Sequence, residues 1–161
     1  MEGFVRYTAV KIWISNLLSA KQIKDEGEFG TTFFVIDNRK IARVNVIGTV
    51  ISGYKKEDGS YSSVDIDDGS ALIRLKTWKE DVKILEGLDV GDLVLIIGRP
   101  REYSGEIYIS PEIIKKLDNS LWSKVRRLEL LKLFGEPVKI QDQKMVENVS
   151  SENSTVVETV S

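Results

Sequence analysis

Five short runs of alternating apolar and polar residues occupy the middle of the chain, with one short helical segment between the third and the fourth. A period of two places successive side chains on opposite faces of a strand, so each run predicts a strand with one buried face. In the third run, ALIRLKTW, Ile73 and Leu75 share one face, whereas Arg74, Lys76 and Trp78 share the other. The chain is therefore expected to build a sheet of short strands.

The first two runs repeat this pattern and add a bend. In IARVNVIGTVIS, Val44 and Val46 share the buried face, and in SVDIDDGS that face holds Val64 and Ile66. Gly48 interrupts the first run, and a glycine inside a strand usually marks a bulge or a sharp bend. A small closed barrel needs such a bend, because its first strand must curve to pair in both halves of the sheet.

The remaining elements complete a known order. KEDVKILEGL predicts a short helix closed by Gly87, and the fourth and fifth runs are DLVLIIGRPREY and IYISPEII. Five strands with a helix between the third and the fourth is the order of the oligonucleotide/oligosaccharide-binding (OB) barrel. We therefore predict a mainly β protein with four parts: an N-terminal extension packing on the barrel (1–39), the five-stranded OB-fold barrel (40–117), a C-terminal oligomerisation helix (118–135) and a disordered acidic tail (136–161).

The tail prediction rests on composition. Residues 136–161 contain no aromatic residue and hold five acidic against two basic residues, whereas residues 1–135 hold 20 acidic and 21 basic ones. Scattered valines in such a segment cannot bury enough surface to offset the entropy of ordering the backbone. We see no signal peptide and no apolar stretch near the roughly 20 residues that span a bilayer. A cytoplasmic protein, and not a membrane protein, is expected.

The residues that most enzymes use are scarce in this chain. It has no cysteine and no histidine, which removes thiolate and imidazole chemistry. The acidic pair Asp67-Asp68 precedes Gly69, where a tight turn explains it better than a metal site does. No glycine-rich phosphate loop and no nucleophile–base spacing is present. We therefore expect no catalysis, no metal, no cofactor and no small-molecule substrate.

The C-terminal helix carries two apolar stripes. Asn119 or Ser120 can cap a helix through LWSKVRRLELLKLF, which ends at Gly135. At about 100° per residue, Leu121, Val125 and Leu128 share one stripe, and Leu130 and Phe134 point to the opposite side. A helix lying on its own barrel needs one stripe, so the second indicates either a partner subunit or a last turn folded back onto the N-terminal segment. The interface candidates are Leu121, Val125, Leu128, Leu130, Leu131 and Phe134.

Cations and aromatic side chains alternate along the outward faces of two strands. The third run presents Arg74, Lys76 and Trp78, and the fourth ends in Arg99, Arg101 and Tyr103 with one parity. Cations neutralise phosphates and flat side chains stack on unpaired bases, which is the mixture that single-stranded nucleic acid requires. The ligand face of an OB barrel is built from its second and third strands and from the loops after its first and fourth strands. The predicted nucleic-acid-binding residues are Trp78, Tyr103, Arg74, Lys76, Arg99, Arg101, Tyr54, Lys55 and Lys56.

Four segments together resemble the middle-sized subunit of replication protein A, particularly its archaeal form. They are VKIWISNLL, RKIARVNVIGTV, IDDGSALIRLKTW and GDLVLIIGRPREYSGEIYI, within a stretch from Lys11 to Phe134. The resemblance implies that Trp78 and Tyr103 stack on single-stranded DNA. It also implies that the helix after the barrel joins helices of other subunits in a three-helix bundle. Family members often continue into a winged-helix domain that recruits repair proteins, and from this sequence we expect no recruitment of that kind.

The function expected from this resemblance is binding and protection of single-stranded DNA in replication, repair and recombination. Three alternatives remain open: a scaffold whose partner subunit binds the DNA, a telomere-type barrel, and an RNA-binding barrel. The near-neutral charge of residues 1–135 favours the scaffold, because strong autonomous binders are usually more basic. Stacking and phosphate contacts do not read the 2′-OH, so the sequence does not distinguish DNA from RNA.

Overall fold

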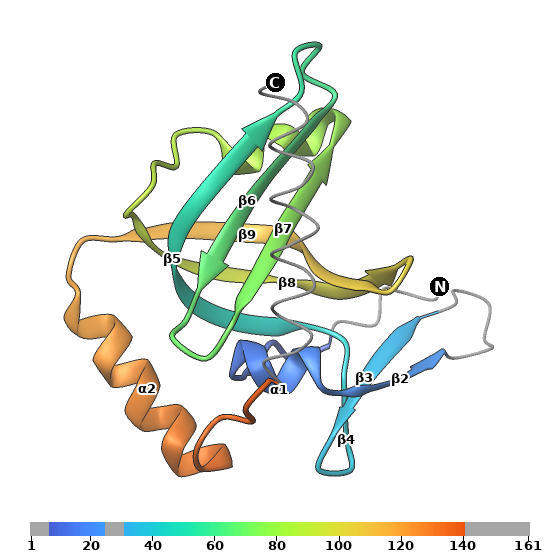
Figure 1. Cartoon of the computed structure of the whole chain (residues 1–161), viewed down its shortest axis with the longest axis vertical. Coiled ribbons are helices and arrows are strands. Elements are labelled where there is room, and N and C mark those ends of the chain that lie inside the picture. Colours follow the sequence, from blue (N-terminus) through green and yellow to red (C-terminus); the bar gives the residue numbers. More distant parts are fainter. Residues whose placement is uncertain (1–6, 25–30, 141–161) are drawn as a thin grey trace, which may run out of the picture.

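The computed structural model of this chain describes residues 7–24 and 31–140 (Figure 1). A closed barrel forms the upper part of the molecule in Figure 1, and a small sheet and two helices lie below it. Most of the predicted tail, residues 141–161, lies outside the described residues. The predicted mainly β fold with a C-terminal helix is confirmed.

Five strands and one 3₁₀ helix make the barrel. The first strand pairs with the second through its C-terminal half and with the fourth through its N-terminal half, and this double pairing closes the sheet in the order β5-β6-β7-β9-β8. The elements are β5 (Val44–Lys55), β6 (Tyr61–Asp67), β7 (Leu72–Trp78), η1 (Lys79–Leu85), β8 (Leu93–Tyr103) and β9 (Glu106–Leu117). The predicted strand order and the helix between the third and fourth strands are therefore present.

The alternating residues point as the sequence predicts. Val44 and Val46 of β5, Ile66 of β6 and Leu75 of β7 are all buried in the barrel core. Their neighbours in each strand face outward because side chains alternate along a pleated strand. The core is purely aliphatic at these positions, which leaves the outward face free to carry a binding surface.

The bulge in the first strand does not lie at the expected glycine. Gly48 is in regular register with Val94, and the register shift falls between Val50 and Ser52. Gly48 instead lies beside the crossing of two pairings, where a Cβ would come within 3.1 Å of the Asp67 carbonyl oxygen. The glycine therefore permits close approach of the backbones, and the bulge two to four residues later turns β5 from β8 toward β6.

Gly98 makes a still tighter approach on the opposite wall. A Cβ at this position would lie 2.5 Å from the Ser110 carbonyl oxygen and 2.9 Å from the Pro111 Cα. The β8–β9 ladder shifts register between Ile97 and Gly98. Because both of these atoms belong to the backbone, no side-chain rotation can relieve such a contact.

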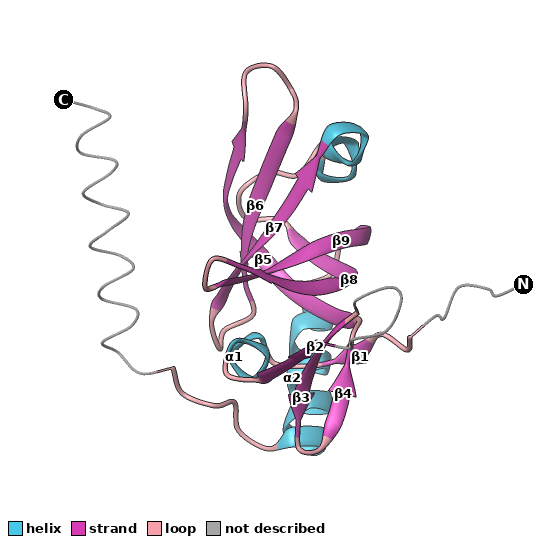
Figure 2. Ribbon diagram, turned by 90° about the vertical axis from the view of Figure 1, so that its right-hand side faces the viewer, coloured by secondary structure: helices cyan, strands magenta, loops and turns pink. Residues whose placement is uncertain are grey.

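The N-terminal segment forms a short helix and a separate antiparallel sheet. Strand β1 (Val10–Lys11) pairs in parallel with the start of β5, and helix α1 (Ile14–Leu18) follows it. Strands β2 (Lys21–Lys24), β3 (Thr32–Ile36) and β4 (Arg39–Ile41) build the small sheet in that order. Figure 2 shows this sheet at the opposite end of the molecule from the β5–β6 loop.

The helix α1 closes the lower end of the barrel core. Ile14 and Leu17 are fully buried and belong to the core cluster. The Ile14 N–H donates to Asp68 Oδ2 (2.9 Å), and the Ser15 N–H donates to Ser70 Oγ (3.1 Å). The turn after β6 therefore supplies the acceptors for the otherwise unpaired amides at the start of α1. This is the structural role of Asp68.

Helix α2 (Leu121–Phe134) follows the barrel. It packs against β5 through the face that carries Leu130, which was predicted to point away from the barrel. Arg126 and Leu130 are the buried residues of this helix, and Leu130 is only 2% exposed. Leu121, Val125 and Leu128 face outward, with Leu128 67% exposed. The assignment of the two stripes is therefore corrected. The search for apolar stripes missed the contact face because that face contains the charged residue Arg126. Its guanidinium can be buried here because it donates to a backbone oxygen of β5.

Arg126 anchors α2 on the first strand. Its guanidinium donates to the Asn45 backbone oxygen (3.0 Å) and to Asn45 Oδ1 (2.9 Å). Burial lowers the pKa of Arg126, with the neighbouring Glu129 acting in the opposite direction. Glu129 itself pairs with Lys11 of β1, and that hydrogen bond lowers the pKa of Glu129. The Arg126–Asn45 and Lys11–Glu129 contacts thus fix α2 on the barrel together with the buried side chain of Leu130.

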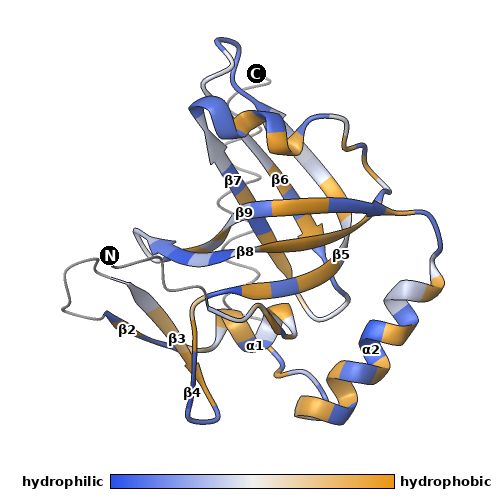
Figure 3. Cartoon of the chain, turned by 180° about the vertical axis from the view of Figure 1, so that it is seen from behind, coloured by the Kyte–Doolittle hydropathy of each residue, from blue (hydrophilic) through white to orange (hydrophobic). Residues whose placement is uncertain are grey.

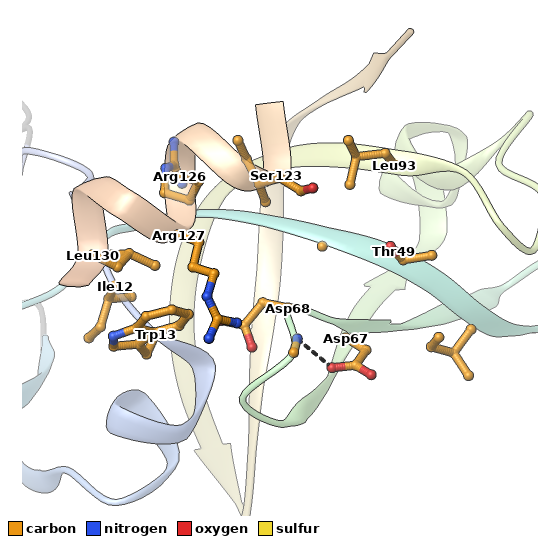
Figure 4. A pocket seen from close by; sticks show the side chains of 14 residues that line it. Ile12, Trp13, Thr49, Asp67, Asp68, Leu93, Ser123, Arg126, Arg127 and Leu130 are labelled. Carbon is orange, nitrogen blue, oxygen red and sulfur yellow. Dashed lines mark hydrogen bonds between the residues drawn. The ribbon is translucent and has the colours of Figure 1, made fainter. Parts of the chain in front are cut away.

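A cavity of about 420 Å³ lies between α2, β5 and the turn that follows β6. Figure 4 shows Trp13 and Leu130 at one end and the Arg127 side chain extending toward Asp68. The helix therefore lies beside the barrel without filling the space between them. In Figure 3, the orange of hydrophobic residues recurs along the length of α2.

Residues 135–140, which follow the helix, return to the N-terminal segment. The Trp13 indole N–H donates to the Gly135 oxygen (3.1 Å), and the Val138 N–H donates to Asn16 Oδ1 (2.9 Å). Ile140 packs against the core cluster. The disordered tail was predicted to begin at residue 136, but residues 136–140 are held by the hydrogen bond from Val138 to Asn16 and by the packing of Ile140.

Replacing Gly98 with alanine should lower the free energy of unfolding by about 1–3 kcal/mol, because the new Cβ overlaps the β9 backbone. Gly53→Ala is the matched control: its Cβ would meet only ordinary contacts at 3.7 Å and 3.8 Å. Chemical denaturation of both variants checks this. Equal effects of the two substitutions would contradict the close approach at Gly98.

The corrected orientation of α2 predicts opposite outcomes for two leucines two positions apart. Leu130→Ala should cost about 2–5 kcal/mol of stability, because it removes a buried side chain. Leu128→Ala should change stability by less than about 0.5 kcal/mol, as expected for an exposed site. Urea denaturation of the two variants measures the difference. A larger effect at Leu128 would restore the original assignment of the stripes.

Candidate nucleic-acid interface

Four aromatic side chains form a continuous row on the outward face of the barrel. The row consists of Tyr54 on β5, Tyr61 on β6, Trp78 on β7 and Tyr108 on β9. Tyr61 and Trp78 are direct cross-strand partners in the β6–β7 ladder. Residues directly opposite each other on neighbouring strands point to the same side of the sheet. The strand register therefore gathers side chains that are far apart in the sequence.

The rings of this aromatic row touch in succession. The centroid of Tyr61 lies 6.1 Å from that of Tyr54 and 5.4 Å from that of Trp78, and Trp78 lies 6.0 Å from Tyr108. The tilted and edge-on geometries are those that aromatic pairs prefer. The mutual contacts restrain the rings and leave part of their surface open.

Exposure differs along the row in a way that suits stacking. Tyr54 is 59% exposed and Trp78 is 45% exposed, whereas Tyr108 is 9% exposed. Tyr108 thus supports the edge of Trp78 while Trp78 and Tyr54 remain accessible. A large aromatic side chain that is half open and held by its neighbours is a preformed platform for a base.

Tyr103 stands at the tip of the β8–β9 hairpin, apart from the row. It is 72% exposed and pairs with Glu106 across the turn. Ser104 and Gly105 both adopt positive φ, 50° and 81°, as a tight two-residue hairpin loop requires. The Gly105 N–H donates to Glu102 Oε1 (2.7 Å), which fixes the turn. Tyr103 is thus presented on an ordered hairpin.

The two cations of the third strand lie on this face, and both are already paired. Arg74 donates to both carboxylate oxygens of Asp65, at 2.8 Å and 3.2 Å, and also lies 3.7 Å from Glu106. Lys76 pairs with Glu106, and its Nζ lies 4.7 Å from the centre of the Tyr108 ring. The positive charge that the sequence places here is therefore balanced by carboxylates on the neighbouring strands.

The other predicted cations differ in whether a carboxylate of the protein already pairs with them. Arg99 lies 3.7 Å from Glu112, which also binds Arg43, and Lys56 lies 3.7 Å from Asp58. Arg101 is the cross-strand partner of Tyr108, so both side chains lie on the same face of the sheet. Arg101 has no ion pair among the described residues. The hydrogen bonds from Ser60 lower the pKa of Asp58, and the neighbouring Lys56 acts in the same direction.

Lys55 is not brought to the same face. In the β5–β6 ladder Lys55 pairs with Ser62, and Ser62 pairs with Thr77, so Lys55 lies on the opposite side of the sheet from Tyr54. It was predicted together with Tyr54 and Lys56 as part of one loop. Instead β5 extends through Lys55, so adjacent side chains alternate between the two faces.

Sequence reasoning missed Tyr61 and Tyr108 as members of the row, and Asp65 and Glu106 as partners of its cations. Tyr61 lies 17 residues before Trp78, and only the β6–β7 register places them together. A hairpin register counted outward from the four-residue loop 68–71 would have found Tyr61 and Asp65. Tyr108 and Glu106 depend on the parallel β7–β9 contact, which no local signal reveals.

The large cavity beside α2 includes no member of the aromatic row among its lining residues. The candidate site is thus an open face, as binding of an extended strand requires. Among residues 7–24 and 31–140, no group of three or more acidic side chains is arranged to hold a metal ion. In the same part of the chain, the helices are all too short or too polar to cross a membrane.

The barrel also matches a known family. Residues 44–117 match the model of the OB-fold nucleic acid binding domain. The barrel therefore has the OB fold. The matched range begins with the first residue of β5 and ends with the last residue of β9, so this OB-fold comprises the barrel strands and excludes α2 and the small sheet.

Three curated proteins resemble the chain over more than the OB-fold. An uncharacterised protein of Methanocaldococcus jannaschii is 33% identical over 128 residues, 80% of this chain and 49% of that protein. The CST complex subunit STN1 of mouse is 26% identical over 83% of this chain and 41% of its own length. Replication factor A protein 2 of Schizosaccharomyces pombe is 24% identical over 66% and 35%. The chain spans less than half the length of each of these relatives.

Two solved structures extend the likeness beyond the OB-fold. The S. pombe Stn1–Ten1 complex contains a chain that aligns with a TM-score of 0.67 at 12% identity, covering 91% of this chain and 99% of that one. A structure of yeast replication protein A bound to single-stranded DNA aligns with a TM-score of 0.60 at 25% identity, covering 78% and 88%. Coverage well beyond residues 44–117 indicates that elements outside the OB-fold are shared as well.

Proposed function

We propose that this protein is a non-catalytic, single-stranded-DNA-binding subunit of a complex similar to replication protein A. In this proposal the OB-fold holds unwound DNA and protects it during replication, repair and recombination in the nucleoid. Bases stack on Trp78 and Tyr103, and nearby arginine and lysine side chains neutralise phosphates. The extension 1–39 supports the barrel and the helix in 118–135 joins the partner subunits.

The aromatic row is the observation that carries the proposal. Trp78 is half exposed and is held from both sides by Tyr61 and Tyr108. These two ring contacts restrain the indole and leave 45% of the residue exposed, so a base can reach it. Stacking of a base on such a platform is worth about 1–3 kcal/mol and tolerates any sequence.

The outward stripe of α2 supports the second half of the proposal, association with other subunits. Leu121, Val125 and Leu128 recur at spacings of four and three residues and are all exposed. Such spacing is that of a helix–helix seam, and soluble monomers rarely leave an apolar stripe uncovered. The resemblance to replication protein A and Stn1–Ten1 assemblies suggests helices of related subunits as the partners.

A second candidate is an assembly subunit whose partners make most of the DNA contacts. The observation that favours it is the pairing of Arg74, Lys76 and Arg99 with carboxylates, which leaves Arg101 as an unpaired cation near the row. The likeness to Stn1 fits this alternative, including a telomere-type role. The two candidates differ in whether the isolated chain binds DNA.

Titration of the isolated chain with labelled oligothymidylate tests the proposal. We expect weak binding at low salt with a shallow salt dependence, because few cations are free to contact phosphates. DNA should quench tryptophan fluorescence, and Trp78→Ala should remove most of that quenching and weaken binding by a factor of roughly 5 to 150.

Trp122→Ala is the matched control for this experiment, because Trp122 is also about half exposed but lies on α2. It should leave both quenching and affinity unchanged. Loss of the fold in Trp78→Ala would mean that the residue is structural. Binding that is absent at low salt in the unmodified chain would favour the assembly candidate.

The association proposal predicts the behaviour of a charged double variant, Leu121→Glu with Leu128→Glu. It should abolish self-association or partner binding, because two buried carboxylates would meet in the seam, while the barrel stays folded and binds DNA as before. Light scattering after size-exclusion chromatography, and co-purification of related OB-fold subunits from the native host, measure this. Val90→Glu, an equally exposed apolar site on a barrel loop, is the control. A strictly monomeric chain that recovers no partner would contradict the proposal.

A further inference from the structure

We infer that Glu106 is an internal competitor of nucleic acid phosphate on the aromatic face. This inference rests on the proposed function and adds to it which residue limits the affinity. Strand phosphates and the Glu106 carboxylate seek the same cations, so a strand gains those cations only by displacing a carboxylate of the protein.

The position of Glu106 is what makes this competition direct. Glu106 begins β9, beside the hairpin that presents Tyr103, and it pairs with Lys76 and approaches Arg74 at 3.7 Å. Lys76 in turn lies over the ring of Tyr108, which contacts Trp78. The carboxylate therefore holds a cation that contacts one ring of the aromatic row.

The competition has a definite thermodynamic consequence. A free surface cation that meets a phosphate releases counterions from the nucleic acid, and each such contact steepens the salt dependence by about 0.7 for a single strand. A cation already neutralised by a carboxylate adds little, because the displaced carboxylate must recruit counterions of its own. Arg74 stays bound to Asp65 through two hydrogen bonds even without Glu106. Loss of Glu106 alone should therefore free one cation, Lys76.

Glu106 is an exposed partner of these cations, so its competition can be removed without opening the core. Its side chain is more exposed than that of Lys76. A glutamine at position 106 keeps the size of the side chain and removes the charge. Glu102 offers a matched control on the same hairpin: its carboxylate accepts the Gly105 N–H and pairs with no cation among the described residues.

The test is fluorescence titration of the full chain with oligothymidylate over a range of salt concentrations, for the unmodified chain, Glu106→Gln and Glu102→Gln. Glu106→Gln should bind more tightly, by a factor of about 5 to 10 near 50 mM salt, and its log–log salt slope should steepen by about 0.7. Glu102→Gln changes net charge equally and should shift the slope far less.

The outcomes separate this inference from the proposed function. Binding by the unmodified chain that Glu106→Gln leaves unchanged in affinity and slope would overturn the inference and leave the proposed function standing. Equal gains in Glu106→Gln and Glu102→Gln would also overturn it, since net charge alone would then explain them. No binding by any of the three chains would overturn the proposed function and the inference together. Weaker binding by Glu106→Gln with a lowered unfolding midpoint would assign the ion pair a purely structural role.

Discussion

The double pairing of β5 is the constraint on which the rest of the structure depends. One strand must pair with β8 through its first half and with β6 through its second half, and this closes the barrel. The turn between the two pairings needs close backbone approach at Gly48 and a register shift after Val50. Once closed, the sheet has a single interior, so every strand has one face toward the core and one face outside the barrel.

The free face explains how a nearly neutral chain can present a nucleic-acid surface. Closure brings Tyr54, Tyr61, Trp78 and Tyr108 from four strands into one row. The same closure places Asp65 and Glu106 beside Arg74 and Lys76. Stacking needs only exposed rings, whereas phosphate binding needs unpaired cations, so the face is better equipped for bases than for phosphates.

The elements outside the OB-fold make one connected support. Asp68 in the turn after β6 accepts a hydrogen bond from the first backbone N–H of α1. Trp13, just before α1, donates a hydrogen bond to the backbone oxygen of Gly135, just after α2. Arg126 ties α2 to the backbone of β5. The orientation of the exposed leucine stripe is therefore set by polar contacts to the barrel. A partner helix would meet a surface whose direction is already determined by the position of the OB-fold.

The sequence by itself determined the strand order, the inward and outward faces of β5, β6 and β7, the limits of α2 and the position of Trp78. These follow from local periodicity, which acts between neighbours in the chain. Only the tertiary structure decided that Tyr61 and Tyr108 join Trp78, that Lys55 leaves the face, and that Leu130 and not Leu128 meets the barrel. Two apolar stripes on one helix are locally equivalent, and the choice between them was made by Arg126, whose burial requires a backbone acceptor that only the folded barrel provides.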